Sequence, residues 1–244
     1  MTERRNIQIC ADGTELARAL AALIVTSATT SVGERGAFRI ALSGGNTPRS
    51  AYELLADQAV SAAVPWQQVS VYFGDERCVP PDDERSNYRM ASRAFLDAVP
   101  IPRSNIHRIR GEIDPGLAAN EYASTLRGNM GNAPDFDLIL LGLGEDGHTA
   151  SLFPGSLPPV DDRALVRAVY AQAQHEWRVT ITPGVINAAR HVVFAVEGAS
   201  KAPALAAVYE GPRDPVTYPA QRVSPTNGEL TWLVDESAAS MLHI

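Results

Sequence analysis

Residues 137–155 read DLILLGLGEDGHTASLFPG, and their pattern indicates the class of fold. Its first part, Asp137–Leu143, is a run of branched apolar residues bounded by glycine, which is typical of a parallel strand covered on both faces. The next part is polar and rich in glycine, and it carries Glu145, Asp146 and His148. Because ligands of open α/β proteins bind beyond the carboxyl ends of the strands, we expect a site at this loop.

His148 is the candidate general base of this loop. A neutral imidazole can take a proton from water near neutral pH, and an adjacent acid, Asp146 or Glu145, can hold its tautomer. The plain alternative is a loop histidine that caps a helix or faces solvent. The position between glycines at the end of a strand favours a functional role. We expect residues 149–153 to open a helix, which Pro154-Gly155 ends early.

The composition narrows the class of protein. The chain has 244 residues and a net charge of −7, so we expect no nucleic-acid and no membrane partner. Its first residues lack the apolar core of a signal peptide, and no run reaches the ~20 apolar residues of a membrane span. Cys10 and Cys78 form neither a disulfide framework nor a metal-ligand spacing. We expect one α/β domain over residues 1–244, cytoplasmic, with reduced thiols, as a monomer or weak homo-oligomer.

A glycine-rich loop follows an earlier strand candidate, Ala37–Leu42. The sequence SGGNTP and the helix after it give the geometry that presents free N–H groups and a positive helix end to an anion. The plain alternative is a Gly-Gly turn with a threonine cap, and the loop lacks the GxxxxGK[ST] nucleotide pattern, so phosphate binding stays open on this loop alone. The candidate phosphate ligands of the loop are Ser43, Gly44, Gly45, Asn46 and Thr47.

Three cations stand near the ends of other strand candidates. Asp75 and Arg77 follow the strand candidate Val69–Phe73, and the guanidinium of Arg77 can bind a carbonyl, carboxylate or phosphate, or pair with its acidic neighbours at the surface. Arg178 opens the alternating run RVTITP, whose polar face fits solvent or a groove. Lys201 lies in the first helical turn after HVVFAV, where a lysine is unfavourable unless it meets an anion.

The remaining periodic segments predict further strands and helices. Arg163–Tyr170 can lie at the edge of the sheet, and His107 is expected to be packed rather than catalytic. The predicted strands are Asn6–Cys10, Ile106–Ile109, Arg163–Tyr170, Trp177–Thr182, His191–Val196 and Leu230–Val234, and the predicted helices include Gly13–Thr29 and Pro115–Leu126.

Together these segments resemble the 6-phosphogluconolactonase family. The similar segments are SGGNTP, GDERCVPPDDERSNY, NIHRIRGE, GHTASLFPG, RVTITP and VEGASKA, spread over about residues 40–205. GHTASLFPG is the most specific of them. Asn46 departs from the family, which more often has serine there, but it keeps a hydrogen-bonding group.

The resemblance implies an open, mostly parallel α/β sheet flanked by helices, Rossmann-like and shared with glucosamine-6-phosphate deaminase and ribose-5-phosphate isomerase. It implies hydrolysis of 6-phospho-D-glucono-1,5-lactone to 6-phosphogluconate, the second step of the oxidative pentose phosphate pathway, without metal or cofactor. The family motif makes His148 the base that acts on water. We assign the other roles as hypotheses: Asp146 orients His148, Arg77 and nearby N–H groups stabilise the oxyanion, Asp75 holds Arg77 or meets a sugar hydroxyl, and Ser43–Thr47 with Arg178 and Lys201 bind the phosphate.

Two other functions stay open. In amino-sugar-phosphate isomerases and deaminases of the same fold, the corresponding loop resembles GHIAFNEPG, and this chain has Phe153 at the place of its glutamate. A non-catalytic sugar-phosphate-binding module would usually carry a basic DNA-binding segment, and only Met1–Cys10 precedes the first predicted helix. A metal-dependent hydrolase is disfavoured because the five histidines show no paired ligand spacing.

Overall fold

The computed structural model describes residues 5–155 and 163–243. Its centre is a six-stranded sheet in the order β1-β9-β8-β5-β2-β3, in which every neighbouring pair is parallel. The strands are β1 (Arg5–Cys10), β2 (Phe38–Leu42), β3 (Val69–Phe73), β5 (Leu138–Leu141), β8 (His191–Val196) and β9 (Glu229–Asp235). The chain builds outward from β2 to β3 and then returns to β5 on the other side of β2, so the carboxyl ends of β2 and β5 form a topological switch point. The predicted open parallel α/β fold is confirmed.

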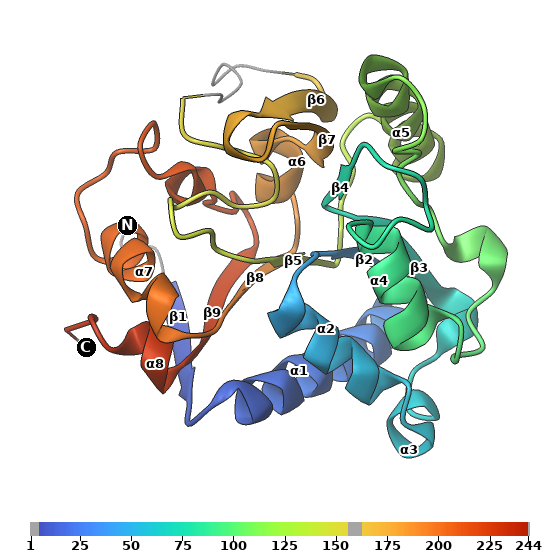
Figure 1. Ribbon diagram of the computed structural model, residues 1–244. Helices are drawn as coiled ribbons and strands as arrows, with labels where there is room; N and C mark the ends of the chain where they lie inside the picture. The colour runs from blue at the N-terminus through green and yellow to red at the C-terminus, as the bar shows by residue number, and fades with distance from the viewer. Residues whose placement is uncertain (1–4, 156–162, 244) are drawn as a thin grey trace.

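A second, antiparallel sheet holds β4 (Asp75–Arg77), β7 (Glu176–Ile181) and β6 (Val166–Ala171) in that order. In Figure 1, β6, β7 and α5 (Pro115–Met130) lie above the main sheet. The prediction that Arg163–Tyr170 can lie at the edge of the main sheet was therefore wrong, because β6 pairs with β7 in the second sheet. Their alternating polar and apolar residues are the pattern of antiparallel strands with one solvated face, whereas the central strands β5 and β8 of the main sheet are nearly continuous apolar runs.

Helices flank the main sheet, and α1 (Gly13–Arg35) and α2 (Asn46–Leu55) pack on each other below it (Figure 1). By length and composition α1 could cross a membrane, with a mean hydropathy of 1.4. In the fold, its Leu16, Leu20 and Ile24 are buried in the hydrophobic core. The other helices are α3 (Gln58–Ser61), α4 (Asn87–Ala91), α6 (Pro183–Asn187), α7 (Ala202–Tyr209) and α8 (Glu236–Ala239).

Residues 149–153 form a turn, not the predicted helix. Ala150 has a left-handed backbone with φ of 49°, which an α-helix of L-residues does not tolerate. The N–H of Leu152 donates to the Thr149 carbonyl at 2.9 Å within the turn, and the Thr149 hydroxyl donates to the Gly142 carbonyl outside it at 2.8 Å. These contacts outweigh the local helix preference.

Ile106–Ile109 was also predicted incorrectly as a strand, since only Ile106 makes a single bridge, to Val71 of β3. His107 stacks on the Tyr72 ring with centroids 4.5 Å apart, which confirms its packed role. The helix predicted to end near Thr29 continues to Arg35.

Candidate active site

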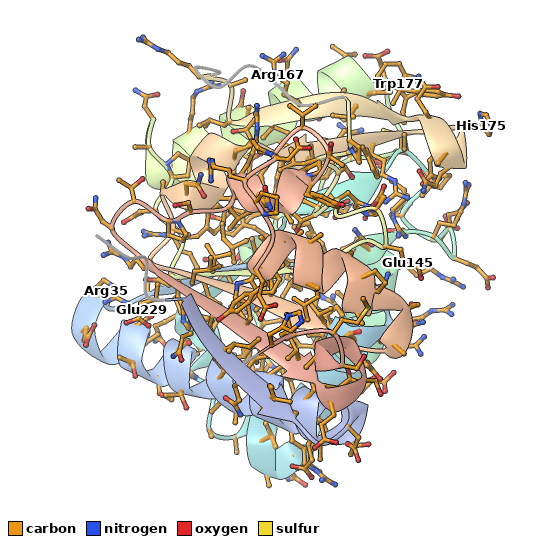
Figure 2. All side chains as sticks on the ribbon, turned by 90° about the vertical axis from the view of Figure 1, so that its left-hand side faces the viewer. Arg35, Glu145, Arg167, His175, Trp177 and Glu229 are labelled. Atoms are coloured by element: carbon orange, nitrogen blue, oxygen red, sulfur yellow. The ribbon has the colours of Figure 1, made fainter. Side chains whose placement is uncertain are left out.

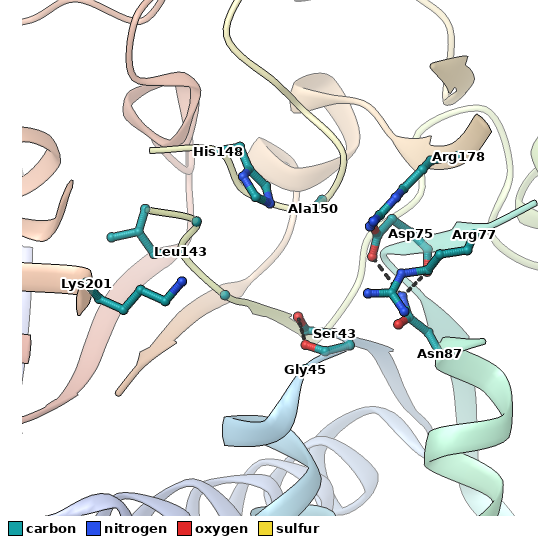
Figure 3. A pocket seen from close by; sticks show the side chains of 13 residues that line it. Ser43, Gly45, Asp75, Arg77, Asn87, Leu143, His148, Ala150, Arg178 and Lys201 are labelled. Carbon is teal, nitrogen blue, oxygen red and sulfur yellow. Dashed lines mark hydrogen bonds and ion pairs between the residues drawn. The ribbon is translucent and has the colours of Figure 1, made fainter. Parts of the chain in front are cut away.

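A cavity of about 200 Å³ lies at the carboxyl ends of β2 and β5, beside the second sheet. Figure 3 shows the glycine loop at its base, His148 above, Lys201 on one side and the two arginines on the other. An adjoining cavity of about 450 Å³ is lined by Asn46 and Thr47, and it shares Lys201 with the first. The predicted residues that line the first cavity are Ser43, Gly44, Gly45, Asp75, Arg77, His148, Arg178 and Lys201.

The glycine loop connects β2 to α2 in the predicted strand, loop and helix arrangement. The fully buried Tyr52 of α2 clamps it, because its hydroxyl donates to the Ser43 carbonyl at 3.0 Å and accepts the Ser43 N–H at 3.1 Å. Gly45 has a φ of 107°, which favours glycine, and it is the N-cap of α2. A glycine cap has no side chain to occupy the first-turn N–H groups, so these groups can meet an anion.

His148 sits in a tight loop that is closed by the N–H of Gly144 donating to the His148 carbonyl at 2.8 Å. Its Nδ1 lies 2.5 Å from Asp146 Oδ1, the contact predicted to orient the ring. The Phe153 ring packs on the imidazole with centroids 4.8 Å apart. Burial alone would raise the pKa of Asp146, but hydrogen bonds from His148 and its charge outweigh burial, and the pKa of Asp146 lies below its ordinary value.

Asp75 is buried in the wall of the cavity, where the Ser151 hydroxyl donates to its Oδ2 at 2.6 Å and the Asn87 amide to its Oδ1 at 3.1 Å. The cation beside it is Arg178, whose Nη1 lies 3.8 Å from Oδ2. The guanidinium of Arg77 instead donates to the carbonyl of Arg85. The alternative in which Asp75 holds Arg77 was therefore wrong.

Arg77 and Arg178 are direct cross-strand partners in the β4–β7 register. Arg178 Nη2 pairs with Glu176 Oε1 at 2.6 Å. Among residues 5–155 and 163–243, the buried Nε atoms of Arg77 and Arg178 have no hydrogen-bond partner. A buried N–H group without a partner is costly, and unsatisfied groups of this kind are typical of functional sites.

Lys201 ends the 3₁₀ turn Ala199–Lys201, directly before α7 rather than inside it. Its Nζ lies 3.9 Å from Glu145 Oε1, and the Glu145 side chain is 65% exposed, so this ion pair is weak. In the described part of the chain, no group of three or more His, Cys, Asp or Glu side chains is arranged to hold a metal ion.

Sequence reasoning missed Asn87, which lines the cavity and touches both sides of it. Its Nδ2 donates to the backbone carbonyl and the carboxylate of Asp75, and a Cβ at Gly44 would come within 1.9 Å of its Oδ1. The segment GDERCVPPDDERSNY gave a signal, since it belongs to the family pattern. Its spacing alone did not show that the loop folds back to bring Asn87 beside Asp75.

The fold and the site define a class of α/β protein with a basic, glycine-lined ligand cavity and a histidine–aspartate pair at the switch point of its sheet. The model of the family of glucosamine-6-phosphate isomerases and 6-phosphogluconolactonases matches residues 11–232, and the chain belongs to this family.

Individual relatives agree with this family. A 6-phosphogluconolactonase from Synechocystis sp. is 46% identical over 226 residues, which covers 90% of this chain and 91% of the relative. The structure of the 6-phosphogluconolactonase from Trypanosoma cruzi matches with a TM-score of 0.88 and 29% identity, covering 100% of this chain and 99% of that one. A monomeric glucosamine-6-phosphate deaminase matches with a TM-score of 0.83 at 21% identity, covering 97% and 99%, which shows the shared fold alone.

Proposed function

We propose that this chain hydrolyses 6-phospho-D-glucono-1,5-lactone to 6-phospho-D-gluconate. One observation carries the proposal: a single cavity is lined by His148 and by the glycine loop with Arg77, Arg178 and Lys201. An anionic sugar ester needs both a group that activates water and cations that hold its phosphate. Relatives that carry the name 6-phosphogluconolactonase, at up to 46% identity, support the same assignment.

The phosphate is assigned to the glycine loop at the base of the cavity, with Lys201 on one side of it and Arg178 on the other. The N–H groups at the start of α2 and its positive end favour an anion there. Asn46 and Thr47 line the adjoining cavity that shares Gly44, Gly45 and Lys201, so they reach the same region. The guanidinium of Arg178, which lines the first cavity, adds donors from the second sheet.

His148 is assigned to the lactone end. Because its Nδ1 is taken by Asp146, Nε2 is the nitrogen that accepts a proton from water as the water oxygen attacks the lactone carbonyl carbon. Arg77 and main-chain N–H groups are assigned to the oxyanion that forms at the carbonyl oxygen. Collapse of that intermediate breaks the ring ester bond, and the proton on His148 passes to the departing ring oxygen, which becomes the C5 hydroxyl.

The groups assigned above all belong to one chain. We therefore take the chain as one α/β unit, a monomer or weak homo-oligomer. We also propose that it acts in the cytoplasm, at the second step of the oxidative pentose phosphate pathway.

The test is a pH-controlled assay of lactone disappearance, corrected for spontaneous hydrolysis, beside an ammonia-release assay with glucosamine 6-phosphate. We expect catalysed lactone loss and no ammonia. Ammonia release without lactone loss would assign the site to deamination instead, and neither activity would remove the proposal of an enzyme acting on these sugars.

A further inference from the structure

Glu76 is a buried carboxylate that the proposed chemistry does not use. It lies on β4 between Asp75 and Arg77 and is 2% exposed. Successive residues of a strand point to opposite faces, so Glu76 points away from the cavity that its two neighbours line. Burial raises the pKa of Glu76, and four hydrogen bonds to its carboxylate oppose this rise. A buried charge is costly, so packing alone does not explain an acid at this position.

The four hydrogen bonds come from uncharged donors in two segments. The N–H groups of Arg77 and Asn87 donate to Oε1 at 2.9 and 2.7 Å. The N–H of Tyr88 and the hydroxyl of Ser86 donate to Oε2 at 2.8 and 3.0 Å. One carboxylate thus joins β4 to the first turn of α4 and closes the loop between them.

This junction sets two residues of the cavity wall. Asn87 is turned toward Asp75, and its side chain packs against Gly44 of the glycine loop. Arg77 is fixed by its own N–H on Glu76, and its guanidinium donates to the carbonyl of Arg85 at the end of the same closed loop. The wall and the glycine loop therefore meet in a geometry that depends on Glu76.

We propose that Glu76 is a positioning residue for lactone hydrolysis. Its carboxylate holds two residues of the cavity wall, Arg77 and Asn87, against the glycine loop. The inference rests on the proposed function. An amide cannot replace the acid, because Glu76→Gln keeps one acceptor oxygen and turns an NH₂ group toward N–H donors that need an acceptor. The substitution therefore keeps the volume and disrupts the junction.

The chain offers a matched control in Asp137, a buried acid at the opposite end of the main sheet. Asp137 accepts the N–H of Arg39 at 2.8 Å and pairs with Arg35 at 3.0 Å, so Asp137→Asn also disturbs a buried carboxylate. We would measure kcat and KM for the phosphorylated lactone at a temperature at which circular dichroism shows each variant folded. We expect kcat/KM to fall about 10- to 100-fold in Glu76→Gln, because Arg77 and Asn87 would be displaced from their positions in the cavity wall. In Asp137→Asn we expect kcat/KM to stay within about 2-fold of the wild-type value.

Equal kcat/KM values for folded Glu76→Gln and Asp137→Asn would overturn the positioning role. Absence of lactone turnover in the wild-type protein would instead overturn the proposed function on which it rests. The double variant Glu76→Gln/Asn87→Ala should lose less than the product of the two single losses, because both act through one wall. If the two losses multiply in full, Glu76 does not act through Asn87, and the proposal is wrong.

Ser86→Ala gives a milder second test if Glu76→Gln does not fold. It removes one of the four donors and leaves the charge in place. We expect a loss in kcat/KM of about 2- to 5-fold relative to Asp137→Asn, which is less than the roughly 10- to 150-fold of a whole hydrogen bond to a charged group because the other three donors remain. An unchanged kcat/KM would contradict the proposal.

Discussion

The two ends of the main sheet carry the same kinds of charged side chain in opposite arrangements. At the amino end, each arginine faces an aspartate: Arg35 and Asp137 lie 3.0 Å apart, and Arg190 and Asp135 lie 2.9 Å apart. Figure 2 shows Arg35 on one side of the molecule, away from Glu145 at the other end. At the carboxyl end, Arg178 also has an acidic partner, Glu176 at 2.6 Å, but Lys201 only approaches the exposed Glu145.

The two ends differ in how many N–H donors lack a partner within the protein. Within the described ranges, the buried Nε atoms of Arg77 and Arg178 have no partner, and the first turn of α2 has no side-chain cap. The amino end has used its charges to hold strands together, which contributes stability. The carboxyl end keeps donors unused, at a cost in stability, and this is typical of a binding site.

The largest expected effect is that of His148→Ala. We expect kcat to fall about 10²- to 10⁴-fold with little change in KM, because the base is lost and the phosphate contacts remain. The matched control is His191→Ala at the amino end of the sheet, where the Nε2 atom of His191 contacts the Thr231 hydroxyl at 2.9 Å. We expect this variant to keep its activity. Near-wild-type turnover in His148→Ala would remove it from the mechanism.

The next variant, Asp137→Ala, changes a residue at the amino end of the main sheet. Asp137→Ala leaves Arg35 and Arg190 without their shared carboxylate and the N–H of Arg39 without its acceptor. We expect the free energy of unfolding in urea to drop by about 2 to 4 kcal/mol. KM for the lactone should stay at its wild-type value, and a raised KM would show that the two ends are not separate.

Lys201→Ala should act on binding. Loss of one charge-assisted contact to the phosphate is expected to raise KM about 10- to 100-fold, with a smaller change in kcat. Arg190→Ala removes an exposed cation at the amino end and is the control, with an unchanged KM. An unchanged KM in Lys201→Ala would exclude it from the phosphate site.

The smallest effect concerns pH. Because the pKa of Asp146 is depressed in the fold, its carboxylate contributes stability above its ordinary value of 3.8 that is lost as the pH falls through the folded value. The side chain is 51% exposed, so we expect less than about 1 kcal/mol. The difference in urea stability between the wild type and Asp146→Asn should shrink as the pH falls from about 5 to below 3.8. A constant difference would contradict this linkage.

Local sequence pattern predicted the parts of the site that short segments build by themselves. The apolar run of β5, the polar loop with His148 and the SGGNTP loop all follow from neighbouring residues, and the parallel sheet brings them to one edge. The parts that failed depend on contacts between distant segments. Ser151 bonds Asp75, 76 positions earlier, and that contact helps hold residues 149–153 in a turn. No short window of sequence contains both partners.

We propose that one bound sugar phosphate touches His148 at one end and the cations at the other. A crystal structure with bound 6-phosphogluconate would show whether it does. We expect the phosphate between Gly44, Arg178 and Lys201, and the carboxylate of the product within about 3 Å of His148 Nε2. A phosphate bound elsewhere, or a carboxylate that His148 does not reach, would contradict it.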